Sequence, residues 1–172
     1  MNEPVRAATA ELRVTYGQFL VRDYDSWVSE DLSPATSNGL VAADSSGAVI
    51  LTGINTGRVN VTVELLDSAP GSVDLDDWDE VVEVSVDSED GELIACGLED
   101  SPLEFPFLSH AGPRPYRLRV HARGRDTAPH LNRFDPVEDY KISVWPAPEA
   151  TETVYKQSDK YGQQVRARRT RP

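Results

Sequence analysis

The sequence predicts an all-β protein, an antiparallel sandwich of two β-sheets with about seven or eight strands. Three observations predict it. Apolar and polar residues alternate over several segments, turn residues separate these segments at short intervals, and no long helical pattern lies between them. We expect one sandwich domain over residues 11–155, an N-terminal arm over residues 1–10 and a basic tail over residues 156–172.

Alternation defines the expected strands. Residues 58–65 read RVNVTVEL, in which every second side chain is apolar, as in a strand with one face in the core. Residues 116–123 and 139–144 repeat this pattern. A further strand begins at Leu12 and is expected to run on to Val21. Shorter strands are expected at residues 48–51, 81–86, 93–96 and 105–107.

Turn residues and a single helical pattern complete the expected elements. Asp90-Gly91 lies between residues 81–86 and 93–96, where it predicts a hairpin turn between two paired strands. The helical pattern covers residues 25–32. The tail has six basic residues against one acid and few apolar ones, so it is expected to lie along the domain or to be mobile.

The formal net charge of −12 restricts the partners. An acidic surface repels nucleic acid and anionic membranes, so the expected partner is a basic protein and direct nucleic-acid binding is disfavoured. Cys96 is the only cysteine, which excludes an intrachain disulfide. The first thirty residues carry several charges and no long apolar run, so we expect no signal peptide and a cytoplasmic location.

The charge is segregated along the chain. Residues 64–104 contain fifteen carboxylates and not one Lys or Arg. Two interpretations are open: a solvated edge that prevents aggregation of sheets, or a docking surface for a basic partner with Trp78 as its aromatic anchor. The candidate partner-binding residues are Asp74, Asp76, Asp77, Trp78, Asp79, Glu80 and Glu83.

An arginine stripe is the counterpart of the acidic run. Arg117, Arg119, Arg123 and Arg125 share the outward side of one expected strand. Their guanidinium groups fit either the carboxylates of the same chain or an external anion, and intramolecular pairing is favoured.

The sequence contains no recognisable catalytic or metal-binding motif. His110, His121 and His130 have no metal-ligand spacing, and Cys96 has no second cysteine beside it. A calcium loop that starts at Asp74 would need a glycine at its sixth position, where Asp79 stands. We therefore expect no enzyme, no cofactor and no metal. A looser calcium site, or a carbohydrate platform of tryptophans, is kept as an alternative.

Several short strings follow one another in an order that resembles a known family. They are VTYGQF (residues 14–19), Trp27, GLVAAD (39–44), the strand 59–65, DWD (77–79), EDGEL (89–93) and GPRPYRL (112–118). Together they resemble the competence protein J family, small acidic inhibitors of a membrane-associated DNA-entry nuclease. The resemblance covers about residues 12–123, and residues 124–172 have no counterpart in it.

This resemblance implies an inhibitor or immunity-type partner of a nuclease or another basic protein. The carboxylates would occupy the basic cleft in which a nuclease takes phosphates. Charge reversal of Asp76, Asp77, Asp79 and Glu83 would then slow association. The alternative from a different class is a structural or adaptor sandwich in a larger assembly.

Overall fold

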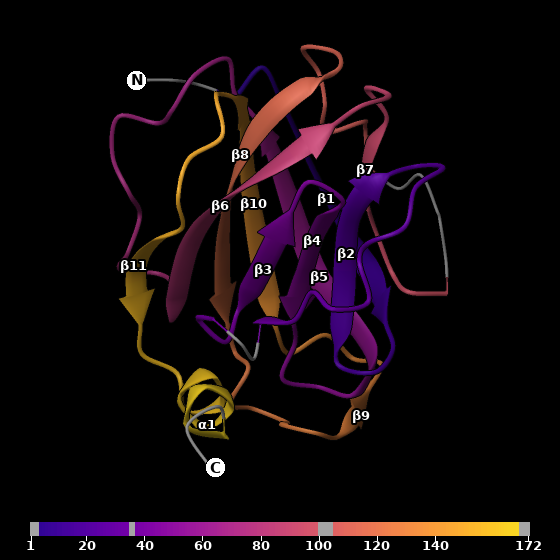
Figure 1. Ribbon diagram of the computed structural model, residues 1–172. Helices are drawn as coiled ribbons and strands as arrows, with labels where there is room; N and C mark the ends of the chain where they lie inside the picture. The colour runs from indigo at the N-terminus through magenta and orange to yellow at the C-terminus, as the bar shows by residue number, and fades with distance from the viewer. Residues whose placement is uncertain (1–3, 35–36, 100–104, 169–172) are drawn as a thin grey trace.

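The computed structural model describes residues 4–34, 37–99 and 105–168. These residues form eleven β-strands and one α-helix, in two sheets that face each other (Figure 1). The all-β class is confirmed, but the described strands outnumber the seven or eight that the sequence predicts. The strands β9 (Asn132–Arg133) and β11 (Thr153–Gln157) lie where no alternation indicates a strand.

The larger sheet has seven strands. Their order is β1-β5-β10-β8-β6-β11, and β9 pairs with β5 beside this path. The bounds are β1 Arg6–Val14, β5 Thr56–Leu65, β6 Glu80–Ser88, β8 Arg114–Arg123 and β10 Asp139–Pro146. The sheet is not purely antiparallel, because β10 and β9 both run parallel to β5. A long connection separates β5 from β10 and allows the chain to return in the same direction.

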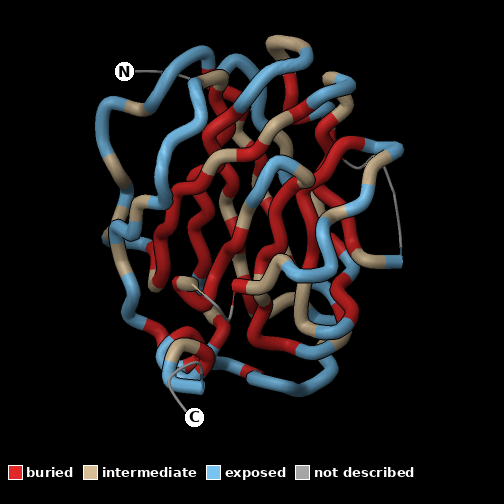
Figure 2. The backbone as a smooth tube through the Cα atoms, viewed as in Figure 1, coloured by how far each residue is buried: buried red, intermediate tan, exposed pale blue. Residues whose placement is uncertain are grey.

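The smaller sheet has four strands in the order β3-β4-β2-β7. The bounds are β2 Gln18–Asp23, β3 Val41–Asp44, β4 Gly47–Leu51 and β7 Leu93–Cys96. The main hydrophobic core lies between the two sheets and includes Phe19, Ile50, Leu118 and Tyr140. Figure 2 shows the buried backbone running through the middle of both sheets.

The expected strand from Leu12 to Val21 is divided by a tight turn. Tyr16 and Gly17 both have positive φ, 54° and 67°, and Thr15 bridges Gln18 across them. Two successive residues in the left-handed region reverse the chain as a primed hairpin turn does. The turn transfers the chain from β1 in one sheet to β2 in the other. The core-facing positions shift from Leu12 and Val14 to Phe19 and Val21, so the alternation changes phase at this turn, which a single continuous strand would not do.

The hairpin expected at Asp90-Gly91 is also wrong. Gly91 does adopt the left-handed conformation expected of a turn, with φ 72°. However, β6 belongs to the larger sheet and β7 to the smaller one, so the turn joins the two sheets rather than two paired strands. Asp23 at the end of β2 stabilises this crossing, because its carboxylate accepts hydrogen bonds from the Ser88 hydroxyl and the Asp90 backbone amide.

Two segments cover the outer face of the larger sheet. Arg119 donates a hydrogen bond to the Ser72 carbonyl, and Arg117 donates one to the Thr151 carbonyl. Residues 66–79 and 147–152, the latter just before β11 (Thr153–Gln157), therefore lie over the strands that carry these arginines. As a result β6 is buried on both faces, unlike a strand of a two-layer sandwich with one wet face.

Residues 156–168, the described part of the expected tail, lie mostly in regular secondary structure. Lys156 belongs to β11, which pairs antiparallel with β6, and residues Lys160–Arg168 form the helix α1. Asp159 caps this helix, since its Oδ1 accepts the backbone amide of Gly162 at 2.7 Å. The helix expected over residues 25–32 is wrong, because that segment consists of turns and irregular loop. Residues 169–172 of the expected tail lie outside the described residues.

Candidate functional site

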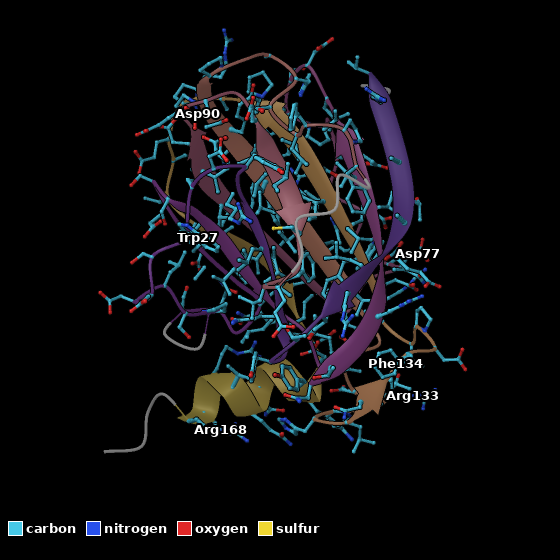
Figure 3. The ribbon with its side chains drawn as sticks, turned by 90° about the vertical axis from the view of Figure 1, so that its right-hand side faces the viewer. Trp27, Asp77, Asp90, Arg133, Phe134 and Arg168 are labelled. Carbon is cyan, nitrogen blue, oxygen red and sulfur yellow. The ribbon has the colours of Figure 1, made fainter. Side chains whose placement is uncertain are left out.

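The acidic run from residue 64 to residue 104 does not form one surface. Figure 3 shows Asp77 at one side of the molecule and Asp90 at the other. The loop of residues 74–77 lies against the outer face of the larger sheet, whereas residues 87–90 lie at the end of β6, where the chain crosses to the smaller sheet. Carboxylates that are continuous in sequence are therefore divided between two sites.

Glu80 lies in the interior. Its side chain is fully buried and faces Arg125 at 3.3 Å and Arg166 at 3.2 Å. Burial raises the pKa of Glu80, and the neighbouring carboxylate of Asp159 raises it further. Arg125 is itself fully buried and also contacts Asp159 at 2.7 Å. This network connects α1 to the sheet and leaves Glu80 unavailable to a partner.

Glu83 is also paired inside the chain. Its two carboxylate oxygens face Arg117 at 3.3 Å and Arg119 at 3.5 Å, and all three side chains are nearly inaccessible. Tyr155 of β11 donates its hydroxyl to the same carboxylate at 2.9 Å. Charge reversal of Glu83 would therefore disrupt the covering of the sheet, whatever it did to a partner.

Trp78 is buried rather than presented as an anchor. Only 8% of the residue is exposed. The guanidinium of Arg123 stacks over its ring at 4.8 Å, and the His121 ring packs against it at 5.4 Å. Trp78 thus connects the loop of residues 74–79 to the strand β8, and its aromatic face is occupied.

The remaining carboxylates of the predicted site are more accessible. Asp74, Asp76 and Asp77 are exposed and Asp79 is half-buried. Asp74 lies 3.8 Å from the ammonium of Lys141, and Asp79 accepts the backbone amide of Gly124 at 3.1 Å. Within the part of the chain that the structure describes, the side chains of Asp76 and Asp77 form no ion pair. These two carboxylates are the accessible remainder of the predicted face.

The arginine stripe is placed in contact with acids of the same chain. Arg117 and Arg119 face Glu83, Arg123 faces Asp139 at 2.9 Å, and Arg125 faces Glu80 and Asp159. The guanidinium of Arg119 also stacks between the rings of Trp145 and Tyr155, at 5.3 and 5.1 Å. Arg117, Arg119 and Arg123 of β8 therefore lie beneath the two covering segments. Arg125 follows the end of β8 and belongs to the buried network at α1, so the predicted stripe of four arginines on one strand is wrong for this residue.

A second acidic surface surrounds Trp27, whose side chain is 76% exposed. A groove of about 260 Å³ lies beside it, and a smaller hollow adjoins this groove along Ser45 and Asp87. We call this region the Trp27 surface; it consists of Trp27 and the carboxylates of Asp44, Asp87, Glu89, Asp90 and Glu149. Figure 3 shows Trp27 and Asp90 on the same side of the molecule.

Arg22 holds the loop that carries Trp27. Its Nη1 donates hydrogen bonds to the backbone carbonyls of Asp23, Tyr24 and Ser26, at 3.1, 2.6 and 3.1 Å. The same guanidinium lies 5.1 Å from the centre of the Trp27 ring. The buried arginine thus fixes both the loop and one face of the indole, so that the other face can meet a partner without a large loss of conformational entropy.

The sequence contained one signal for this surface and one obstacle. The pairs Asp44-Ser45 and Asp87-Ser88 are polar residues at strand ends, where surface loops are expected. However, the four segments that form the surface are far apart in the chain. Only the crossing from β6 to β7 brings residues 87–90 beside the loop of Trp27, and that crossing was mistaken for a hairpin.

The two alternatives, a looser calcium site and a carbohydrate platform of tryptophans, each require a cluster of side chains. Among the described residues no group of three or more His, Cys, Asp or Glu side chains is placed to hold a metal ion. A platform of the three tryptophans does not form, because Trp78 and Trp145 are buried and Trp27 alone is exposed. No helix in the described ranges is long and apolar enough to cross a membrane.

The fold and the Trp27 surface define a class: a two-sheet β-protein that presents an exposed aromatic ring among carboxylates. Two solved structures share the fold. One is "ComJ, inhibitor of the DNA degrading activity of NucA, from Bacillus subtilis", with a TM-score of 0.59, 17% identity, and coverage of 86% of this chain and 99% of that one. The other, "Crocagin biosynthetic gene J", has a TM-score of 0.50, 19% identity, and coverage of 82% and 97%. No family model and no curated protein matches the sequence.

The comparison confirms the predicted resemblance to competence protein J at the level of the fold. The likeness extends beyond the two thirds of the chain on which the resemblance was based, since 86% of the chain is covered. Part of the region after residue 123 therefore also belongs to the shared fold. Identity of 17% carries no residue of ComJ over to this chain.

Proposed function

We propose that this protein is a non-enzymatic binding module that inhibits a nuclease or another basic protein. The observation that carries the proposal is Trp27, an exposed indole supported by a buried arginine and surrounded by carboxylates. Aromatic side chains of this kind dominate the binding energy of many protein interfaces. The fold shared with ComJ, which is described as an inhibitor of NucA, favours a nuclease as the partner.

The mechanism that we propose is occupation of a basic cleft. A nuclease surface that binds phosphates presents Lys and Arg, and the Trp27 surface offers Asp44, Asp87, Glu89 and Asp90 to them. Charges of opposite sign accelerate the encounter of the two proteins. The Trp27 ring then becomes buried against the partner, and this contact slows dissociation. The association rate should therefore fall as salt rises, while the dissociation rate should depend mainly on Trp27.

The loop of residues 74–79 is the competing location for the interface. It offers Asp76 and Asp77 as accessible carboxylates, but its aromatic residue, Trp78, is buried. We place the interface at the Trp27 surface because, of these two acidic regions, it is the one whose tryptophan ring is exposed. The proposal keeps the expected cytoplasmic location, which fractionation of cells that express the chain would test.

The experiment compares two variants of equal charge. Glu89→Lys/Asp90→Lys alters the Trp27 surface and Asp76→Lys/Asp77→Lys alters the other acidic loop, and each changes the net charge by the same amount. The probes are the nuclease encoded nearest to this chain in its genome and NucA of B. subtilis. Inhibition of DNA degradation and association rates by surface plasmon resonance are measured at low and at physiological salt.

The expected result is a loss of at least about tenfold in affinity for Glu89→Lys/Asp90→Lys and for Trp27→Ala. The control Asp76→Lys/Asp77→Lys should change affinity by less than about threefold, through long-range steering alone. Loss of inhibition in the control, with normal inhibition by Trp27→Ala, would place the interface on the other loop and refute our assignment. Unaltered DNA degradation with both nucleases would reject them as targets.

A further inference from the structure

The edges of the two sheets differ in how well they are protected. Unpaired backbone groups at a sheet edge can pair with another chain, and proteins usually block them with short strands, bulges or charges. The edge strands β3 and β7 have four residues each. The edge strand β11 has five, and its register breaks between Val154 and Lys156. These three edges are protected by length or by irregularity.

The fourth edge, β1, carries the charges of Arg6, Glu11 and Arg13 but is protected neither by a short length nor by an irregular register. It has nine residues and pairs with β5 in an unbroken register from Arg6 to Val14. Its sequence, RAATAELRV, contains no proline and no lysine. Among the described strands none pairs with its outer side, and Figure 3 shows it as the outermost strand of the larger sheet. Gly97 lies close to the Arg13 carbonyl near one end of β1. A long and regular edge strand is the surface that a further β-strand would extend.

We infer that the occupant of this edge is β1 of a second copy of the chain. Two antiparallel copies of β1 related by a two-fold axis would join the larger sheets into one continuous sheet. Such an isologous contact closes on itself and gives a dimer rather than a filament. The inference concerns a different surface from the proposed inhibitory site and does not depend on it.

The register follows from the geometry of the strand. Residues directly opposed in an antiparallel pair must have the same orientation toward the edge, so one residue must lie opposite its own copy, with the axis midway between the two copies. We name the axis by that residue. An axis through Ala10 is the choice that pairs all nine residues, from Arg6 with Val14 to Val14 with Arg6. Thr9 then lies opposite Glu11, and Ala7 lies opposite Arg13. No two like charges are directly opposed, and small residues meet at the centre.

The charge distribution also favours this edge. Two copies with a net charge of −12 repel each other, so they should meet where the surface is least acidic. β1 carries Arg6 and Arg13 against Glu11 alone, and Arg58 lies beside Arg13 on the neighbouring strand. The Trp27 surface lies on the other side of the molecule in Figure 3, so each copy in the dimer keeps it exposed.

The test is the mass of the full chain in solution, by sedimentation velocity and light scattering from about 1 μM to about 1 mM. We expect wild type to approach twice 19.0 kDa as the concentration rises. Ala10→Lys places two ammonium groups opposite each other on the axis and should shift the dissociation constant at least about tenfold toward monomer. The matched control is Thr127→Lys, the same added charge at an exposed position of the loop before β9.

A second variant identifies the register and covers a failure of Ala10→Lys to fold. Directly opposed Cβ atoms of antiparallel strands lie about 5 Å apart, close enough for a disulfide after small adjustments. Ala10→Cys should therefore form a covalent dimer under mild oxidation, whereas wild type, whose Cys96 is buried, and Thr127→Cys should not. Wild type that remains monomeric at every concentration, or a dimer that tolerates Ala10→Lys and shows no crosslink through Ala10→Cys, would overturn the inference.

Discussion

Replacing the buried His121 should change the pH dependence of stability in a direction that the structure defines. His121 lies on β8 and is only 2% exposed. Its Nδ1 lies 3.0 Å from the Lys141 carbonyl, so Nδ1 carries the proton of the neutral ring and donates to that oxygen. The pKa of His121 is lowered from 6.5 to about 4, mainly by burial. The charges of Lys141 and Arg119 act in the same direction, whereas the hydrogen bond to the Lys141 carbonyl and the carboxylate of Asp74 oppose the shift.

The sign and the size of the effect follow from this pKa. The unfolded chain takes up the proton at about pH 6.5, whereas the folded chain takes it up only near pH 4. Stability contributed by the neutral ring is therefore complete above pH 6.5 and is lost as the pH falls toward 4. A shift of about 2.5 pH units corresponds to about 3 kcal/mol, of which about 2 kcal/mol is lost between pH 7 and pH 5.

The assay is urea unfolding of wild type and of His121→Asn at pH 7, 6 and 5. The asparagine amide retains a donor for the Lys141 carbonyl and removes the titrating ring. The difference in free energy of unfolding between the two proteins should shrink by about 2 kcal/mol from pH 7 to pH 5. Val81→Ala, a change in the residue paired with His121, serves as the control and should keep a constant difference from wild type. A constant difference for His121→Asn as well would refute the reasoning.

Three further predictions concern stability. Arg125→Met should cost about 3–5 kcal/mol in urea unfolding, because it leaves the carboxylates facing Arg125 buried without a counter-charge, and a cost below about 1 kcal/mol would contradict the network. Gly57→Ala should cost at least about 2 kcal/mol, since φ is 147° and the added Cβ would lie 1.7 Å from the Arg133 carbonyl oxygen, whereas Gly71→Ala, with open space around it, should be close to neutral in thermal unfolding. Trp78→Ala should cost about 3–5 kcal/mol and Trp27→Ala less than about 1 kcal/mol, and equal costs would show that the exposure of the two rings is misassigned.

Alternation predicted the long strands well because each has one face in the core. Residues 58–65 and 116–123 lie in β5 and β8. The same pattern does not say which sheet a strand joins. The Tyr16-Gly17 turn shifts the core-facing positions from Leu12 and Val14 to Phe19 and Val21 as the chain changes sheets, a change of phase that the expected single strand ignores. Asp90-Gly91 has the turn residues of a hairpin, but the strands on either side of it belong to different sheets. Both errors arose where a tight turn crosses between layers instead of joining neighbours.

The accessibility of the charged residues was harder to predict, because two covering segments form a third layer over the larger sheet. A strand with polar residues on one side is expected to face water on that side. In this protein residues 66–79 and 147–152 cover that side, so Arg117 and Arg119 of β8 pair with Glu83 of β6 beneath them. Trp78 belongs to the covering layer and is buried, while Trp27 has no such cover. The periodicity of one strand does not indicate whether a segment distant in the sequence packs on its polar face.

The helix α1 was also not predicted from the sequence, because contacts with distant parts of the chain determine it. Its apolar content is low, and tertiary contacts rather than a strong apolar stripe hold it in place. Tyr161 and Val165, one helical turn apart, are its main buried side chains. The signal that was available is the capping residue Asp159 before a run of nine residues without proline.

Because Arg125 pairs with Asp159 in the interior, truncation near the carboxyl terminus should destabilise the protein more than a change at the amino terminus. Shortening the protein to end before residue 158 would remove Asp159 and Arg166 together and leave a guanidinium and Glu80 in a cavity newly open to water. Fusion partners and affinity tags are therefore better attached at the amino terminus, and loss of the last fifteen residues to a protease should be followed by unfolding of β11 and of the sheet edge that it completes.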